Sequence, residues 1–198
     1  ALVCNEFDPE RAKRLTRTLH DFIPPHTVTF AVTRLDSRRC HRSLSFDRVL
    51  LDAPCSSERH LLHQSGGVER WSLRHAERTA ESQRAMLLRA MDAVSVDGIL
   101  VYSTCSICPL ENDGVVSGAL RRARATFKVL APLSSSLSLG GTVTPVGGVE
   151  LFPDRCGGIG PIYVCRLQRL DEVRPPDGSS SSEDEEKDND DDDDNDER

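Results

Sequence analysis

The chain has 198 residues, enough for one ordinary α/β domain with a sizeable core. Its net charge of −7 hides an asymmetry, because thirteen acids and two bases give residues 177–198 a charge of −11 and leave +4 on residues 1–176. Seven cysteines, an odd number with no signal peptide in view, argue against a secreted disulfide framework and favour an intracellular setting. No apolar run has the length of a transmembrane helix, so we expect a soluble chain without a membrane partner.

Short apolar segments alternate with longer helical patterns along the chain. The pattern predicts strands at 1–4, 27–32, 46–54, 98–103 and 161–170, and helices at 9–22, 77–94 and 110–124. Asp8 followed by Pro9 is typical of a helix start, and the run Val49–Leu51 is typical of a strand buried on both faces. Residues 125–160, rich in Gly and Ser, are left unassigned. The alternation predicts an α/β fold with a parallel sheet and helices on both faces.

The C-terminal segment is strongly acidic and has no apolar residue that would anchor it. The stretch "SSSSEDEEKDNDDDDDNDER" is expected to stay disordered and solvated, because its like charges repel. Two prolines and a glycine in "VRPPDG" mark the boundary, so we divide the chain into a domain at residues 1–172 and a tail at residues 173–198. A solubilising role is the simpler interpretation of the tail, and competition with RNA for the basic domain is the alternative.

Acids and thiols follow the ends of the predicted strands. Ligands of parallel α/β sheets bind beyond the carboxyl ends of the strands, so the residues at those positions are the candidate site. They are Asn5-Glu6, Leu35-Asp36, Asp52-Ala53-Pro54-Cys55 and Ser103-Thr104-Cys105.

Each acid has a functional and a structural interpretation. Glu6 is placed to accept hydrogen bonds from ribose hydroxyls, and its alternative is an acid favoured by the helix dipole. Asp36 is placed to bond an adenine amino group or to cap a turn. Asp52 ends a strand that we expect to be fully buried, where a carboxylate is costly unless it is paired.

Cys105 and Cys108 lie three positions apart, a spacing with several interpretations. A zinc site needs four ligands, and the other late cysteines, Cys156 and Cys165, lie nine apart near a different strand, which disfavours a closed zinc site. A redox dithiol normally begins a helix, so it is conceivable before the next helix but not favoured. A lone buried cysteine is most often inert packing. The remaining interpretation is one working thiol with a bystander, and the spacing does not say which cysteine is which.

The motifs "DAPCS" and "YSTCS" end two successive predicted strands, with "ESQRAMLL" between them and "LENDGVV" after the second. In this order they resemble the Sun-domain (Fmu-type) RNA cytosine-5 methyltransferases, and the resemblance covers about residues 1–170, including the closing "GPIYVCRL". The stretches "CNEFDPERAKRLTRTLHDFIP" and "DAPCSSERH" are most similar to the mitochondrial branches of the family, which implies a mitochondrial location.

The resemblance implies a Rossmann-like doubly wound methyltransferase sheet with S-adenosylmethionine as cofactor. It implies that the thiolate of Cys105 adds to C6 of a cytosine and so activates C5 for methylation, and that Cys55 helps to break this covalent link. Asp52 is implied to stabilise the base as charge develops during the attack. The implied cofactor contacts are Glu6 and Arg11 at the ribose, Asp36 and Ser37 at the adenine, and Asp52.

The implied partner is RNA, either rRNA or tRNA, with the target cytosine single-stranded or flipped. Phosphate contacts are expected from a set of basic residues whose alternative is a solvated face of mixed charge. The set is Arg11, Lys13, Arg14, Arg17, Arg38, Arg39 and Arg42.

The sequence departs from the family pattern at its beginning. The family's first strand, with its glycine-rich turn and lysine, is not among these residues, so we expect an incomplete, N-terminally truncated sheet with weak cofactor binding. A catalytically inactive RNA-binding or scaffold remnant of the same fold is therefore the alternative function. A thiol redox or metal protein, which depends on the Cys105 and Cys108 pair alone, is the third.

Overall fold

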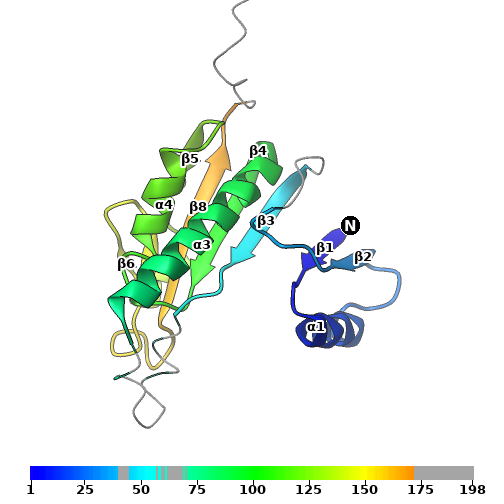
Figure 1. Cartoon of the computed structure of the whole chain (residues 1–198), viewed down its shortest axis with the longest axis horizontal. Helices are drawn as coiled ribbons and strands as arrows, with labels where there is room; N and C mark the ends of the chain where they lie inside the picture. Colours follow the sequence, from blue (N-terminus) through cyan, green and yellow to red (C-terminus); the bar gives the residue numbers. More distant parts are fainter. Residues whose placement is uncertain (40–44, 57, 59–60, 62–68, 70, 172–198) are drawn as a thin grey trace, which may run out of the picture.

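The computed structural model describes residues 1–39, 45–56, 58, 61, 69 and 71–171. Within these residues the chain forms two sheets (Figure 1). The acidic tail, Arg42 and most of the segment between Ser56 and Trp71 lie outside the described residues. No helix in the described part of the chain combines the length and apolar composition needed to cross a membrane.

The N-terminal unit is a strand, a helix and a second strand. β1 (Leu2–Asn5) pairs in parallel with β2 (Phe30–Thr33), and α1 (Pro9–Phe22) connects them. The predicted helix start is confirmed, because the Asp8 side chain accepts a 2.8 Å hydrogen bond from the backbone nitrogen of Arg11. The rings of His20 and Phe30 meet edge to face at 5.0 Å, which packs α1 onto β2.

The larger sheet has six strands. Its members in chain order are β3 (Phe46–Asp52), β4 (Val94–Thr104), β5 (Phe127–Val129), β6 (Thr142–Val143), β7 (Val149–Leu151) and β8 (Ile162–Arg169). The helices α3 (Leu73–Ala93), α4 (Asp113–Leu120) and the short α5 (Ser134–Ser138) lie between them in sequence. The strand order is β3-β4-β8-β7-β6, and β5 also pairs with β8.

The sequence predicts a parallel sheet, but this sheet is mixed. β3 and β4 pair in parallel, whereas β8 runs antiparallel to β4, β5 and β7. The reason is the connection before β8: the ten residues from 152 to 161 are too few for a crossover helix, so the chain returns in the opposite direction. The residues left unassigned by sequence, 125–160, form β5, α5, β6 and β7.

The hydrophobic core lies between this sheet and two helices. α3 and α4 both pack on the face that carries Leu100 and Tyr102 of β4 and Leu167 of β8, and all three side chains are fully buried. Figure 1 shows α3 running along the strands with α4 beside it. The expectation of one helix layer on each face is therefore not met by α3 and α4.

The opposite face of β3 is open. Leu50 is 69% exposed, whereas its neighbours Val49 and Leu51 pack against the core. The prediction of a strand buried on both faces is thus wrong for Leu50, because β3 is an edge strand whose helices cover one face only.

The two faces can be compared by truncating one leucine on each. Leu100→Ala should lower the free energy of unfolding by about 2–5 kcal/mol, because it leaves a cavity in a closed core. Leu50→Ala, in the adjacent strand, should change it by less than about 0.5 kcal/mol. Chemical denaturation followed by circular dichroism measures both, and equal losses would contradict the open face.

Candidate active site

The parallel pairing of β3 and β4 brings two cysteine-bearing loops together. Asp52 is in register with Ser103, and the backbone nitrogen of Ala53 donates a 2.9 Å hydrogen bond to the carbonyl of Ser103. The loops that follow carry Cys55 and Cys105, whose Sγ atoms lie 2.7 Å apart. Cys105 is exposed and Cys55 is half-buried, so a reactant can reach the pair from solvent.

Asp52 lies at the edge of this site. The sequence predicts a buried position for it, and this prediction is wrong. It is exposed and accepts a 3.2 Å hydrogen bond from Ser103 Oγ. The reason is the alternation of side chains along a strand, which places Asp52 on the same open face as Leu50. Its carboxylate therefore faces solvent beside the two loops.

Glu111, which the sequence analysis did not identify, fixes the Cys55 loop through buried hydrogen bonds. Its fully buried carboxylate accepts hydrogen bonds from the Ser56 hydroxyl, from the Ser56 backbone nitrogen at 3.0 Å and from Gln83 Nε2 at 2.9 Å. Gln83 also donates to the Pro54 carbonyl at 2.8 Å. A signal was present in the sequence, since Gln83 shares the helix face of Ala80 and Leu87 and is a polar residue at a core position.

Glu58 joins the two loops. One of its carboxylate oxygens, Oε1, lies 2.7 Å from Ser56 Oγ and 2.9 Å from Ser106 Oγ. The loop after β4 is also braced from within, because Thr104 donates to Asn112 Oδ1 at 2.7 Å and Asn112 donates to the Ser106 carbonyl at 3.0 Å. Hydrogen bonds to Ser56, Thr104 and Ser106 therefore support the two segments that carry the thiols.

Cys108 is buried, whereas Cys105 is exposed. Glu58, Cys108 and Glu111 do place one potential ligand atom each within 4.8 Å of one another, an arrangement that can hold a metal ion. The carboxylate oxygens of this group already accept hydrogen bonds from hydroxyl, amide and backbone donors. The zinc interpretation of Cys105 with Cys108 gains nothing from this group, because Cys105 is not one of its members.

Four of the five residues expected to contact a cofactor lie on or beside the smaller sheet, whereas the fifth, Asp52, ends β3 of the larger one. Glu6, just after β1, binds Arg11 at 2.8 Å and accepts a hydrogen bond from the Asp8 backbone nitrogen at 2.9 Å. Asn5, to which the sequence analysis assigns no separate role, links the end of β1 to the loop after β2, because its side-chain nitrogen donates a 2.9 Å hydrogen bond to Ser37 Oγ. Asp36 follows β2 in the same loop as Ser37.

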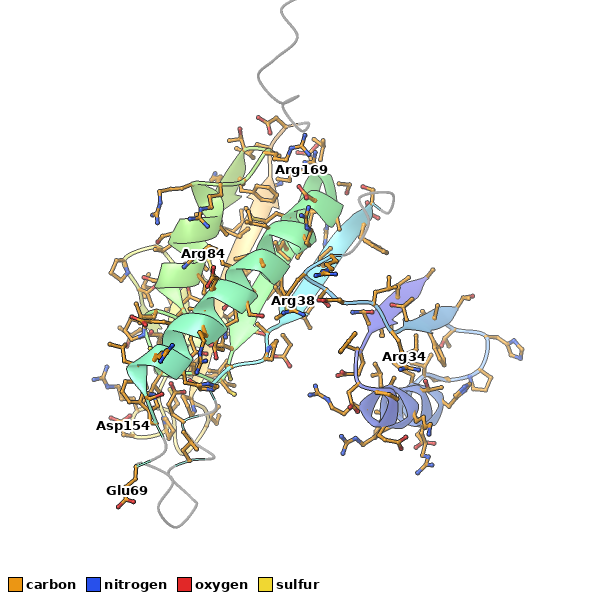
Figure 2. All side chains as sticks on the ribbon, viewed as in Figure 1. Arg34, Arg38, Glu69, Arg84, Asp154 and Arg169 are labelled. Atoms are coloured by element: carbon orange, nitrogen blue, oxygen red, sulfur yellow. The ribbon has the colours of Figure 1, made fainter. Side chains whose placement is uncertain are left out.

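The site residues thus fall into two groups, one on each sheet. Figure 2 shows Arg38 between the β1–β2 pair and β3. A described contact bridges the two parts, since Arg89 of α3 donates a 3.3 Å hydrogen bond to the carbonyl of Arg38. The structure therefore brings Cys55, Cys105 and Asp52 together and leaves Glu6 and Asp36 as a second cluster.

Asp36 is ion-paired with Arg38. Both carboxylate oxygens accept from the guanidinium, Oδ1 from Nε at 2.9 Å and Oδ2 from Nη2 at 2.8 Å. These hydrogen bonds lower the pKa of Asp36 to about 2. The carboxylate is therefore ionised at neutral pH and remains an acceptor.

The fold is that of the methyltransferases. The chain superposes on an NSun6 structure from Pyrococcus horikoshii with a TM-score of 0.68 at 22% identity, over 86% of this chain and 41% of that one. A methyltransferase homolog from the same organism gives a TM-score of 0.63 at 24% identity, over 85% and 52%. At these identities the likeness concerns the fold.

Sequence comparison goes further. The family model described as 16S rRNA methyltransferase RsmB/F matches residues 1–168, and the chain belongs to this family. It is 31% identical to the mouse mitochondrial tRNA (cytosine(34)-C(5))-methyltransferase, over 89% of this chain and 53% of that protein. It is 34% identical to ribosomal RNA small subunit methyltransferase F of Erwinia tasmaniensis, over 88% and 36%. The chain therefore spans about half the length of these relatives or less.

The ion pair of Asp36 can be tested by titration. Because the pKa of Asp36 is lowered, the pair is fully formed above the ordinary carboxyl pKa and is lost as pH falls through about 2. Arg38→Ala should raise the pKa of Asp36 back toward its ordinary value, as measured by carboxyl NMR chemical shifts. Arg39→Ala is the matched control and should move the pKa far less, since the Arg39 side chain affects the Asp36 carboxyl through its charge alone and makes no hydrogen bond that lowers the pKa. Equal shifts in the two variants would contradict the assignment.

Proposed function

We propose that this chain is the catalytic part of an RNA cytosine-5 methyltransferase that uses S-adenosylmethionine. The observation that carries the proposal is the contact between the Cys55 and Cys105 thiols at the ends of two neighbouring parallel strands. Membership of an rRNA methyltransferase family and likeness to a tRNA cytosine-5 methyltransferase support RNA as the substrate, either rRNA or tRNA. The mouse relative also supports a mitochondrial location for this protein.

Cys105 is the nucleophile in this proposal, because it is the more exposed of the two thiols. Its thiolate adds to C6 of the cytosine, and the electron pair of the C5–C6 double bond moves onto C5. When bound, S-adenosylmethionine would supply an electrophilic methyl group to C5 and would leave as S-adenosylhomocysteine. Loss of the C5 proton to a base then restores the double bond and expels the Cys105 thiolate. Cys55 lies 2.7 Å from the departing sulfur and is placed to assist this release.

Asp52 has the position of an electrostatic partner for the base. It lies on the open face at the start of the Cys55 loop, next to Ser103. A carboxylate beside the cytosine ring can accept a hydrogen bond from the exocyclic amine of the base and so hold the ring in place as the sulfur attacks. This role needs the base to stand outside a helix, so the substrate cytosine is single-stranded or flipped.

The cluster on the smaller sheet fits the nucleoside part of the cofactor. Glu6 and Asp36 each bind one arginine, and a carboxylate oxygen can accept a second hydrogen bond. A vicinal diol therefore finds an acceptor at Glu6, with Arg11 holding the carboxylate in place. Asp36 and Ser37 supply an acceptor and a hydroxyl for the adenine.

The nucleophile can be identified by trapping. Wild-type protein is incubated with S-adenosylmethionine and in vitro transcripts of a small-subunit rRNA and a tRNA, and products are separated under denaturing conditions. Cys55→Ala should accumulate a covalent protein–RNA complex, because release is impaired after attack. Cys105→Ala should form none and should lose methyl transfer by at least about 10³-fold, the scale of removing a catalytic nucleophile.

The outcomes separate the candidate functions. A complex in Cys105→Ala, or none in Cys55→Ala when the wild type methylates RNA, would show the two roles to be wrongly assigned. RNA binding by a wild type that transfers no methyl group would support the second candidate, a non-catalytic RNA-binding protein.

A further inference from the structure

The two cysteine loops are joined by a reciprocal pair of glutamates. A serine follows each cysteine, Ser56 after Cys55 and Ser106 after Cys105. Glu58, from the Cys55 loop, contacts the hydroxyl of Ser106, and Glu111, from the Cys105 loop, contacts the hydroxyl and backbone nitrogen of Ser56. Each loop therefore supplies a carboxylate to the serine of the other.

This arrangement is buried although it is built from charged residues. Glu58 is 6% exposed and Glu111 is fully buried. A buried carboxylate is stable only where hydrogen-bond donors replace water, and here most of the donors come from the opposite loop. Moving one loop away from the other would remove most of the hydrogen-bond donors of both buried acids. The carboxylates thereby resist any change in the separation of the loops.

We propose that Glu58 is a positioning residue that sets the distance between Cys55 and Cys105. It is the residue that contacts both serines, through one oxygen, at 2.7 Å from Ser56 Oγ and 2.9 Å from Ser106 Oγ. Its contribution to RNA methylation rests on the function proposed above. The positioning concerns two thiols that are in contact in the folded protein, so it can be measured without RNA.

Hydrogen counting predicts which substitution the site tolerates. Ser56 has one hydroxyl proton but two carboxylate neighbours, Glu58 and Glu111. In Glu58→Gln the amide nitrogen in the place of Oε1 can donate one N–H to Ser56 Oγ and the other to Ser106 Oγ, which leaves the Ser56 hydroxyl proton for Glu111. Glu58→Gln should therefore preserve the link between the loops. Glu58→Ala removes every contact of the side chain and should break it.

The test measures how readily the two thiols form a disulfide with each other. The full chain is equilibrated with reduced and oxidised glutathione, so that oxidation of Cys55 and Cys105 is balanced by reduction of glutathione disulfide to two thiols. Peptide mass spectrometry identifies this bond among the seven cysteines. Glu58→Ala should lower the equilibrium constant at least tenfold, and Glu58→Gln should stay within about twofold of the wild type. An unchanged constant in a folded Glu58→Ala protein, or a loss in Glu58→Gln as large as in Glu58→Ala, would overturn the proposal.

Two controls separate positioning from general destabilisation. Glu81→Ala removes an exposed glutamate of α3, and Leu100→Ala weakens the core outside both loops, so neither should change the constant while the protein is folded. If Glu58→Ala fails to fold, Ser106→Ala takes its place, because it removes the second loop's hydroxyl from Glu58. It should lower the constant by several-fold, and no change would again overturn the proposal.

A parallel assay with RNA keeps this proposal distinct from the function it serves. If the chain methylates RNA, Glu58→Ala should accumulate the covalent complex expected of Cys55→Ala, because a displaced Cys55 cannot assist release. A wild type that transfers no methyl group, together with a tenfold loss in the glutathione constant of Glu58→Ala, would reject the methyltransferase function and retain the positioning role. If the wild type methylates RNA, normal RNA release and an unchanged glutathione constant in Glu58→Ala would reject the positioning role and retain the methyltransferase function.

Discussion

The parallel pairing of β3 with β4 is the interaction on which the candidate active site depends. Because the strands run in the same direction and Asp52 is in register with Ser103, both chains leave the sheet at one edge. Cys55 follows three residues beyond β3 and Cys105 follows β4 directly, so fifty positions of sequence separation become a 2.7 Å contact. A shift of the register by one residue would turn each side chain of β3 to the other face and separate the thiols.

Buried polar contacts then convert this proximity into a defined geometry. The described residues 53–56 and 105–112 lie outside helices and strands, so their backbone polar groups need partners other than those of a regular element. Gln83 of α3 and Glu111 hold the Cys55 loop, while Asn112 braces the Cys105 loop and Glu58 links the two. The cost of leaving any of these groups unpaired in a dry core makes the arrangement cooperative.

The two sheets show how far periodicity alone predicts the fold. Most strands and helices and the Asp8 cap were identified, because their signals are local. The direction of β8 was not, since pairing direction depends on the length of the connection and on which strand is available to pair. The exposure of Leu50 was misjudged for a related reason: an apolar run shows that a strand can be buried, but not which of its faces a helix covers.

The sequence by itself determined the chemistry available to this protein: two Cys-Ser motifs after successive strands, an acid before the first, and acids after the two N-terminal strands. These features are short and contiguous, so they can be read without coordinates. Only the tertiary structure decided that Asp52 lies on an open face and that Glu58 and Glu111 exchange partners across the loops. The physical reason is that burial and hydrogen bonding depend on neighbours some fifty residues apart in sequence.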